Sequence, residues 1–154
     1  ASKNGVDVRI MVPYIPDKVL VNQVTKSNYL TLLKSGVRIY EYTPGFVHAK
    51  TIISDDEFGV IGSINFDYRS YFLHFENGVW MYQSSAIYDC KEDKWSLIDR
   101  TVISNKFKVS PVDCKEDFIK TLDLCHEVTY DEYMKTNAAL RLMRSILNLF
   151  SPLL

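Results

Sequence analysis

The sequence predicts an α/β domain, a β-sheet flanked by helices, and three observations support this. Residues 6–43 follow the order strand, helix, strand, and residues 47–64 contain two further β-branched segments joined by a polar turn. Residues 138–154 carry apolar side chains at helical spacing. With 154 residues, 47% of them hydrophobic, the chain is long enough to bury a core as a single domain, so we treat 1–154 as one unit.

The first elements follow the chain in order. Residues 1–5, ASKNG, are typical of the end of a helix with Gly5 as its stop, so we expect the chain to be a fragment of a longer one. Residues 6–14 predict a buried strand, after which Asp17 is placed to cap a helix that runs to Ser35. Residues 35–43 predict the next strand. A strand, helix, strand order of this length favours parallel pairing.

A hairpin is predicted next, with strands at 47–54 and 58–64 and a turn at 55–57, followed by a strand at 76–83. Residues 113–128 have helical spacing, with Cys125 on the apolar face. The run DCKED occurs at 89–93 and again at 113–117, which marks residues 89–112 as a predicted insertion. The last predicted element is an amphipathic helix over 138–154, with Arg141 and Arg144 away from its apolar face.

Composition narrows the classes of function. The formal net charge is −1, whereas a protein held to nucleic acid by its phosphates is usually basic, so no nucleic-acid partner is expected. No run of about 18 apolar residues occurs, and the first residues lack the apolar core of a signal peptide. The three cysteines form no CxxC pair and are expected to be reduced thiols.

Polar side chains interrupt the two apolar strands of the predicted hairpin. His48 and Lys50 are two residues apart, so both would emerge on one face, and Ser63 and Asn65 share the same spacing. If the two hairpin strands pair in register, these four side chains would converge at one end of the sheet. Imidazole can act as nucleophile or proton carrier, and lysine, serine and asparagine can hold phosphoryl oxygens. Gly62 would let a bulky group approach the backbone.

This spacing, HxK, four residues, Asp, six residues and GSxN, resembles the motif of the phospholipase D superfamily. His48, Lys50 and Asp55 match its first part, and Gly62, Ser63 and Asn65 match its second part. The resemblance implies that His48 is catalytic, that Lys50, Ser63 and Asn65 bind the substrate phosphate, and that Asp55 is structural and fixes the turn. The family also places a glutamate eleven residues after the asparagine, hydrogen-bonded to a catalytic histidine. Glu76 stands there.

Longer stretches are similar to the second half of bacterial cardiolipin synthases. The resemblance implies a phospholipase D-like mixed β-sheet flanked by helices, one half of a two-half fold. It also implies phosphatidyl transfer between two phosphatidylglycerol molecules, with glycerol release and a phosphohistidine intermediate, and with neither metal nor cofactor. The stretches that carry it are GVDVRIMVPYIPDK, GVRIYEYTPGFVHAK, GSINFDYRS, HFENGVWMY and LRLMRSILNLFSPLL.

The family needs two facing motifs, and this chain has one. The resemblance therefore implies a partner, either a missing N-terminal half or a second copy. It also implies a site at the membrane surface of a bacterial cell, with the catalytic part on the cytoplasmic side. Residues 89–112 depart from the resemblance.

Several alternatives stay open on the sequence. His48 is either the nucleophile or the acid/base, and the superfamily pattern favours the acid/base. The helix at 138–154 packs on a membrane, on its own core or on the missing half. The rival function is a homodimeric, single-motif phosphodiesterase or nuclease, and a non-catalytic half-domain ranks third because His48 and Lys50 are both present.

Overall fold

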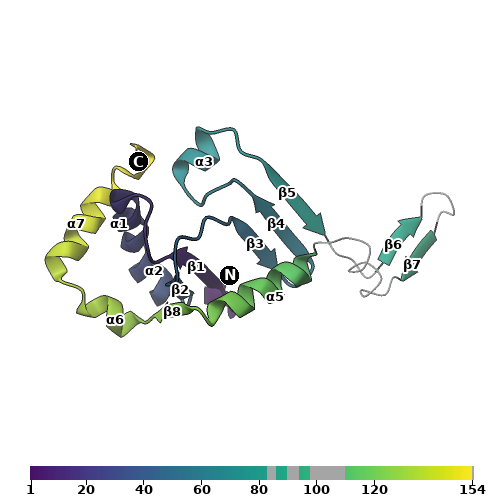
Figure 1. The fold of residues 1–154 in the computed structure, drawn as a ribbon, viewed down its shortest axis with the longest axis horizontal. Coiled ribbons are helices and arrows are strands. Elements are labelled where there is room, and N and C mark those ends of the chain that lie inside the picture. Colours follow the sequence, from purple (N-terminus) through teal and green to yellow (C-terminus); the bar gives the residue numbers. More distant parts are fainter. Residues whose placement is uncertain (83–85, 90–93, 98–109, 154) are drawn as a thin grey trace. The chain divides into compact units, whose positions relative to one another are not determined.

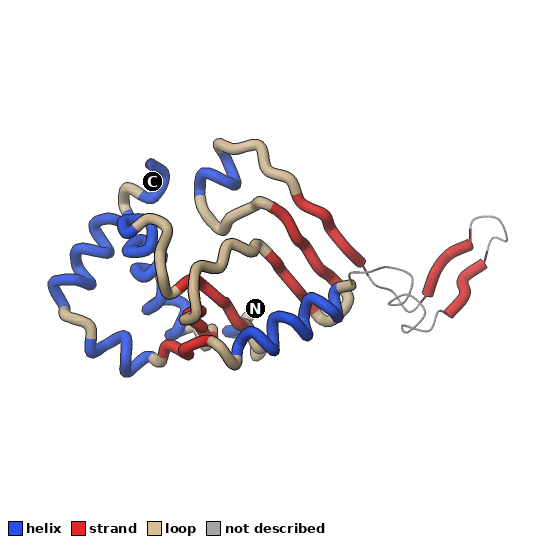
Figure 2. The backbone as a smooth tube through the Cα atoms, viewed as in Figure 1, coloured by secondary structure: helices blue, strands red, loops and turns tan. Residues whose placement is uncertain are grey.

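The structure, a computed structural model, describes residues 1–82, 86–89, 94–97 and 110–153. Helices and strands alternate along the chain, which confirms the predicted α/β class (Figures 1 and 2). The chain divides into two compact units. The first consists of Ala1–His48, Asn65–Phe75 and Lys120–Leu154, and the second of Ala49–Ile64 and Glu76–Ile119. Each unit is described by itself.

The first unit is built on a mixed three-stranded sheet in the order β1-β2-β8. Strand β1 (Arg9–Pro13) pairs in parallel with β2 (Arg38–Tyr42), which confirms the predicted parallel strand, helix, strand unit. Strand β8 (Cys125–Val128) pairs antiparallel with β2. The prediction of a helix over 113–128 was wrong at its C-terminal end, because Cys125 begins a strand that pairs with β2.

The helix predicted over 17–35 is two helices, α1 (Val19–Ser27) and α2 (Tyr29–Lys34), broken at Asn28. The break lies next to Tyr29, which is 3% exposed. Asp17 is not the cap that we predicted. Lys18, in an extended conformation, stands at the N-cap without a side-chain hydrogen bond, so the carboxylate of Asp17 lies one residue too early to cap the helix.

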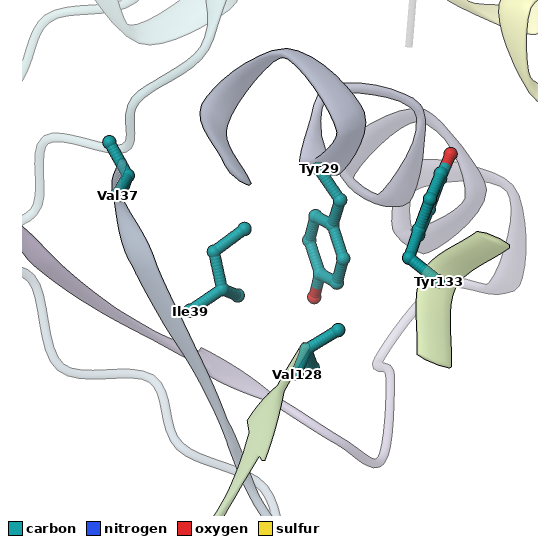
Figure 3. Packing of buried hydrophobic residues seen from close by; sticks show 5 residues of the cluster. All are labelled: Tyr29, Val37, Ile39, Val128 and Tyr133. Atoms are coloured by element: carbon teal, nitrogen blue, oxygen red, sulfur yellow. The ribbon is translucent and has the colours of Figure 1, made fainter. Parts of the chain in front are cut away.

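The hydrophobic core of the described residues lies in the first unit (Figure 3). Ile39, 1% exposed, packs with Tyr29 and Val128, and the rings of Tyr29 and Tyr133 lie 6.2 Å apart. Figure 3 shows the hydroxyls of these two tyrosines pointing in opposite directions. Tyr133 comes from α6 (Tyr130–Lys135), a helix that the sequence pattern did not predict and that Thr129 caps.

The helix predicted over 138–154 ends earlier, at Asn148. It is α7 (Ala138–Asn148), followed by the 3-10 turn η2 (Ser151–Leu153). Its burial also differs from the prediction. Arg144 is buried, while Ile146 and Phe150 are exposed, because α7 packs against α1 through the face that carries Arg144. Among the helices that the structure describes, none is long and apolar enough to cross a bilayer.

The short elements of the first unit are a 3-10 turn at Ser2–Asn4 and α3 (Tyr68–Phe72). Gly5 follows the turn with φ 88°, a left-handed conformation that suits the predicted stop.

The second unit contains an antiparallel sheet of β3 (Thr51–Ser54), β4 (Phe58–Gly62) and β5 (Gly78–Tyr82). Ser54 pairs with Phe58, so the predicted hairpin is confirmed. The unit also holds the pair β6 (Ala86–Asp89) and β7 (Lys94–Leu97) and the start of α5 (Pro111–Leu122). Parts of residues 89–112 lie outside the described residues, and their assignment as an insertion stays a prediction.

Candidate active site

The hairpin turn carries the aspartate of the motif. Asp55 and Asp56 have φ angles of 54° and 61°, and the amide of Glu57 donates to the carbonyl of Ser54 over 3.2 Å. Two successive positive φ angles suit the tight turn of a β-hairpin, and aspartate tolerates them better than most residues. The Asp55 carboxylate accepts the Ser54 hydroxyl over 2.8 Å. Asp55 thus lies at the turn, at the end of the hairpin opposite to Lys50.

The other motif residues of the second unit gather at the open end of the hairpin. The amide of Gly62 donates to the carbonyl of Lys50 over 3.1 Å, and the amide of Ser63 donates to the carbonyl of Asn77 over 2.8 Å. These bonds continue the pairing of β4 beyond the strand ends on both sides. The open end therefore brings together the backbones of Lys50, Gly62 and Ser63 with the chain that enters β5.

The neighbouring backbone requires a glycine at position 62. A Cβ atom at this position would lie 2.3 Å from the carbonyl oxygen of Asn77 and 2.7 Å from the Cα of Gly78, closer than real Cβ atoms come. The sequence predicted that Gly62 leaves room for a bulky group. In the structure the close neighbour is the backbone at Asn77 and Gly78, which can approach because position 62, the partner of Gly78, is a glycine.

Ser63 and Glu76 are brought into direct contact. The Ser63 hydroxyl donates to Oε2 of Glu76 over 2.5 Å and accepts the amide of Asn77 over 3.1 Å. A hydroxyl has a single proton to donate, so Ser63 can donate to a substrate phosphate only after it releases Glu76. The predicted bond between Glu76 and a catalytic histidine stays a prediction, as does the role of Ser63 in phosphate binding.

A depression of about 390 Å³ opens at this end of the sheet. Gly62, Ser63, Asn77 and Gly78 line it, together with the apolar side chains of Ile61 and Val79. Its volume lies within the range of about 300–1,000 Å³ that is usual for small-molecule sites. A wall that combines backbone and hydroxyl groups with two aliphatic side chains can contact both a polar headgroup and an attached apolar group.

His48 and Asn65 belong to the first unit. The prediction that His48 and Lys50 share a strand was wrong, since β3 begins at Thr51 and both residues precede it. The imidazole of His48 lies 5.6 Å from the ring of Phe46, centroid to centroid. The convergence of His48 and Asn65 with Lys50 and Ser63 stays a prediction.

Two residues that the motif does not include anchor Asn65. The amide of Asn65 donates to the Ser70 hydroxyl over 3.2 Å, and Ser70, 7% exposed, donates its own amide to Oδ1 of Asp67 over 2.7 Å. Asp67 thereby caps α3. The spacing of Asp67 and Ser70 is typical of a helix N-terminus and could have indicated this anchor from the sequence.

The segment that follows Asn65 is rich in exposed apolar side chains. Six large apolar side chains are solvent-exposed within residues 66–75. The same segment holds Arg69 and His74, whose Nη2 and Nε2 atoms lie 3.2 Å apart. Exposed apolar side chains that gather in one segment are typical of a surface that contacts a protein or a membrane. The six are Phe66, Tyr68, Tyr71, Phe72, Leu73 and Phe75.

Comparison with known families identifies the class of protein that this fold and motif define. Residues 1–98 match the family described as cardiolipin synthase, PLD-like domain. The match covers more than half of the chain, so the chain belongs to this family.

Its relatives are bacterial proteins. The chain is 40% identical over its whole length to an uncharacterized protein of Streptococcus mutans, 34% identical to a cardiolipin synthase of Clostridium perfringens and 33% identical to one of Halalkalibacterium halodurans. It spans 26% to 28% of the length of these three relatives. No solved structure matches the chain.

Proposed function

We propose that the chain supplies one of the two catalytic motifs of a phosphatidyl transferase that makes cardiolipin from two molecules of phosphatidylglycerol and releases glycerol. The observation that carries the proposal is the open end of the hairpin, where Lys50, Gly62, Ser63 and Glu76 meet beside a depression of about 390 Å³. Membership of the cardiolipin synthase, PLD-like family supports the same reaction.

The reaction proceeds by two displacements at one phosphorus atom. A histidine nitrogen attacks the phosphorus and forms a P–N bond as the P–O bond to glycerol breaks, and a second, protonated histidine gives its proton to the departing oxygen. That histidine then takes the proton from a hydroxyl of the second phosphatidylglycerol, whose oxygen displaces the first histidine. We assign His48 to the acid/base role.

The remaining motif residues hold the phosphate. Lys50 contributes a positive charge, and Ser63 and Asn65 contribute neutral hydrogen bonds that stabilise the charge of the pentavalent transition state. The bond from Ser63 to Glu76 holds that hydroxyl beside the depression until substrate replaces the carboxylate. Asp55 acts on the turn and not on the substrate.

The second histidine has to come from elsewhere. The sequence contains one HxK motif and spans about a quarter of the length of its relatives, which supports its assignment as one part of a longer enzyme, and we propose that it is the C-terminal half. A second copy of the chain is the alternative source. The exposed apolar side chains of residues 66–75 and of α7 support work at a membrane surface, where the lipid substrate lies.

The test is phosphatidylglycerol turnover in mixed micelles across a range of protein concentrations, first by this chain and then by the chain joined to the preceding part of its parent protein. We expect glycerol release to be lost in His48→Ala, by a factor of about 100 or more. His126→Ala is the matched control, since His126 is an exposed histidine that contacts Glu132 and lies outside the motif.

The outcomes separate the candidates. Release that rises more steeply than first order in protein means that two copies assemble the site, and release only by the longer protein means that the other half supplies the histidine. Cleavage of a soluble phosphodiester or of DNA, without cardiolipin formation, would overturn the proposal in favour of a phosphodiesterase.

A further inference from the structure

A second pocket lies inside the first unit, and the proposed reaction does not use it. Its volume is about 100 Å³, and Lys26, Tyr29, Glu41, Glu132 and Arg144 are among the residues that line it. In the described chain, none of the motif residues lines it. Three of these side chains carry charge and are largely withdrawn from water, which is costly unless each charge is matched.

The charge of Glu41 is matched within the pocket. Glu41 is 5% exposed, its Oε1 lies 2.9 Å from the ammonium of Lys26, and the same atom accepts the hydroxyl of Tyr29 over 3.0 Å. Lys26 and Glu41 therefore neutralise each other, and Tyr29 adds a hydrogen bond to the same carboxylate oxygen. The other carboxylate at the pocket, that of Glu132, has both oxygens 2.9 Å from Nε2 of His126.

Arg144 is a buried charge of the pocket without a carboxylate partner among the described residues. It is 8% exposed, and its Nε donates to Oε1 of Gln23 over 2.7 Å. Among the residues that the structure describes, no carboxylate pairs with Arg144, and its two terminal nitrogens have no hydrogen-bond acceptor. Arg144 lines the pocket together with Tyr29, and its positive charge partly offsets the rise in the pKa of Tyr29 that burial and Glu41 cause. A buried guanidinium with unused donors is stabilised by an anion or an ordered water molecule beside it, and an anion also balances its charge.

We propose that this pocket binds one small oxyanion, a phosphate or the phosphodiester of a lipid headgroup, through the terminal nitrogens of Arg144. A guanidinium presents two parallel N–H groups that match two oxygens of such an anion, and Arg144 lines the pocket. The volume limits the ligand to a group of about this size. Exposed apolar side chains of α1 and α7, among them Leu20 and Ile146, could contact the acyl chains of a lipid source.

The first experiment measures orthophosphate binding by calorimetry and by the thermal midpoint, with sodium chloride of equal ionic strength as the reference. We expect Arg144→Gln, which keeps a polar group near Gln23, to weaken binding at least tenfold, and Arg144→Lys to weaken it less. Arg141→Gln is the matched control, because Arg141 is a half-buried arginine on the same helix that bonds Met134 and does not line the pocket. This variant should bind phosphate as the unmodified chain does.

The variant Lys50→Gln distinguishes phosphate bound at the candidate active site from phosphate bound in this pocket. The binding that depends on Arg144 should persist in Lys50→Gln, so this inference and the proposed function can fail independently. Equal phosphate affinity in Arg144→Gln and Arg141→Gln, or an effect that chloride reproduces, would overturn the proposal. In that case the pocket holds only water.

A second measurement does not depend on the folding of any variant. Crystals of the parent chain soaked in tungstate should show anomalous scattering within the pocket, and its absence there would contradict the proposal. Cosedimentation with phosphatidylglycerol vesicles, against phosphatidylcholine vesicles, then decides the source. Loss of the vesicle preference in Arg144→Gln supports a lipid headgroup, and an unchanged preference with weaker orthophosphate binding supports free phosphate.

Discussion

The two units of the chain use burial in opposite ways. In the first unit, helices cover the sheet β1-β2-β8, and Ile39, Tyr29 and Val128 lose nearly all contact with water. In the described part of the second unit, the buried residues are Gly59, Ser110 and Pro111, none of which has a large side chain. Its sheet instead carries an aromatic row of half-buried Phe58 and exposed Trp80 and Tyr82, and the ring centroids of Phe58 and Tyr82 lie 4.8 Å apart.

The difference indicates how each unit is held together. Apolar burial of about 25 cal/mol per Å² stabilises the first unit, whereas the second depends more on strand pairing, turn geometry and the close approach of glycine backbones. The open end of the hairpin, where we place the phosphate site, is therefore ordered mainly by backbone hydrogen bonds. Substitutions matched between the units test this.

The largest expected contrast is between two isoleucines in strands. Ile39→Ala removes a fully buried side chain of β2 and should lower the free energy of unfolding by about 2–5 kcal/mol. Ile61→Ala, in β4 and 37% exposed, should cost less than half as much, because less apolar surface is lost and little cavity remains. Urea denaturation followed by circular dichroism measures both. Equal losses would show that the sheet of the second unit is as well packed as the first.

A glycine substitution tests the backbone approach directly. Gly62→Ala places a methyl group against the Asn77 carbonyl, and we expect a loss of about 1–3 kcal/mol together with faster hydrogen exchange at the Ser63 amide. Gly45→Ala is the control, since a Cβ atom there would have no neighbour within 4 Å, and it should change stability by about 0.5 kcal/mol at most. Unchanged exchange at Ser63 would sink the idea that Gly62 orders the site.

The buried hydroxyl of Tyr29 in the first unit predicts that the stability of the fold depends on pH. Burial, and then the charge of Glu41, raise the pKa of Tyr29 above its ordinary value of 10.0. Above about pH 10 the unfolded chain releases this proton while the folded chain keeps it, so stability is fully present below that pH and falls above it. The slope for one proton is about 1.4 kcal/mol per pH unit.

The measurement is the free energy of unfolding between about pH 9 and pH 11. Tyr29→Phe should flatten the decline by one proton's contribution, whereas Tyr71→Phe, an exposed tyrosine, should leave it unchanged. Parallel curves for the parent chain and Tyr29→Phe would contradict the assignment.

The smallest expected difference in stability is between substitutions of two aspartates that lie near the starts of helices. Asp67 caps α3 and holds Ser70, so Asp67→Ala should cost about 0.5–2 kcal/mol and loosen the segment that anchors Asn65. Asp17→Ala should cost little, because the side chain of Asp17 does not cap α1. Hydrogen exchange at the Ser70 amide checks the first, and thermal midpoints check both. A larger loss for Asp17→Ala would restore the cap that the sequence predicted.

Local patterns predicted part of this arrangement correctly. The strand, helix, strand order at the start and the hairpin around Asp55 are both present, since periodicity and turn residues act over a few neighbouring positions. Patterns failed where distant segments decide. Cys125 lies in a strand because β2 pairs with it, and the face of α7 that carries Arg144 is buried because α1 covers it.

The sequence by itself determined the family, the α/β class and the identity of the motif residues, because these depend on residue types and spacing alone. Only the tertiary structure decided that Gly62 makes room for β5, that the Ser63 hydroxyl is held by Glu76, and that a buried arginine faces a small polar pocket. These features join residues far apart in the chain, and no local pattern carries such contacts. Their energies depend on burial and distance, which folding alone sets.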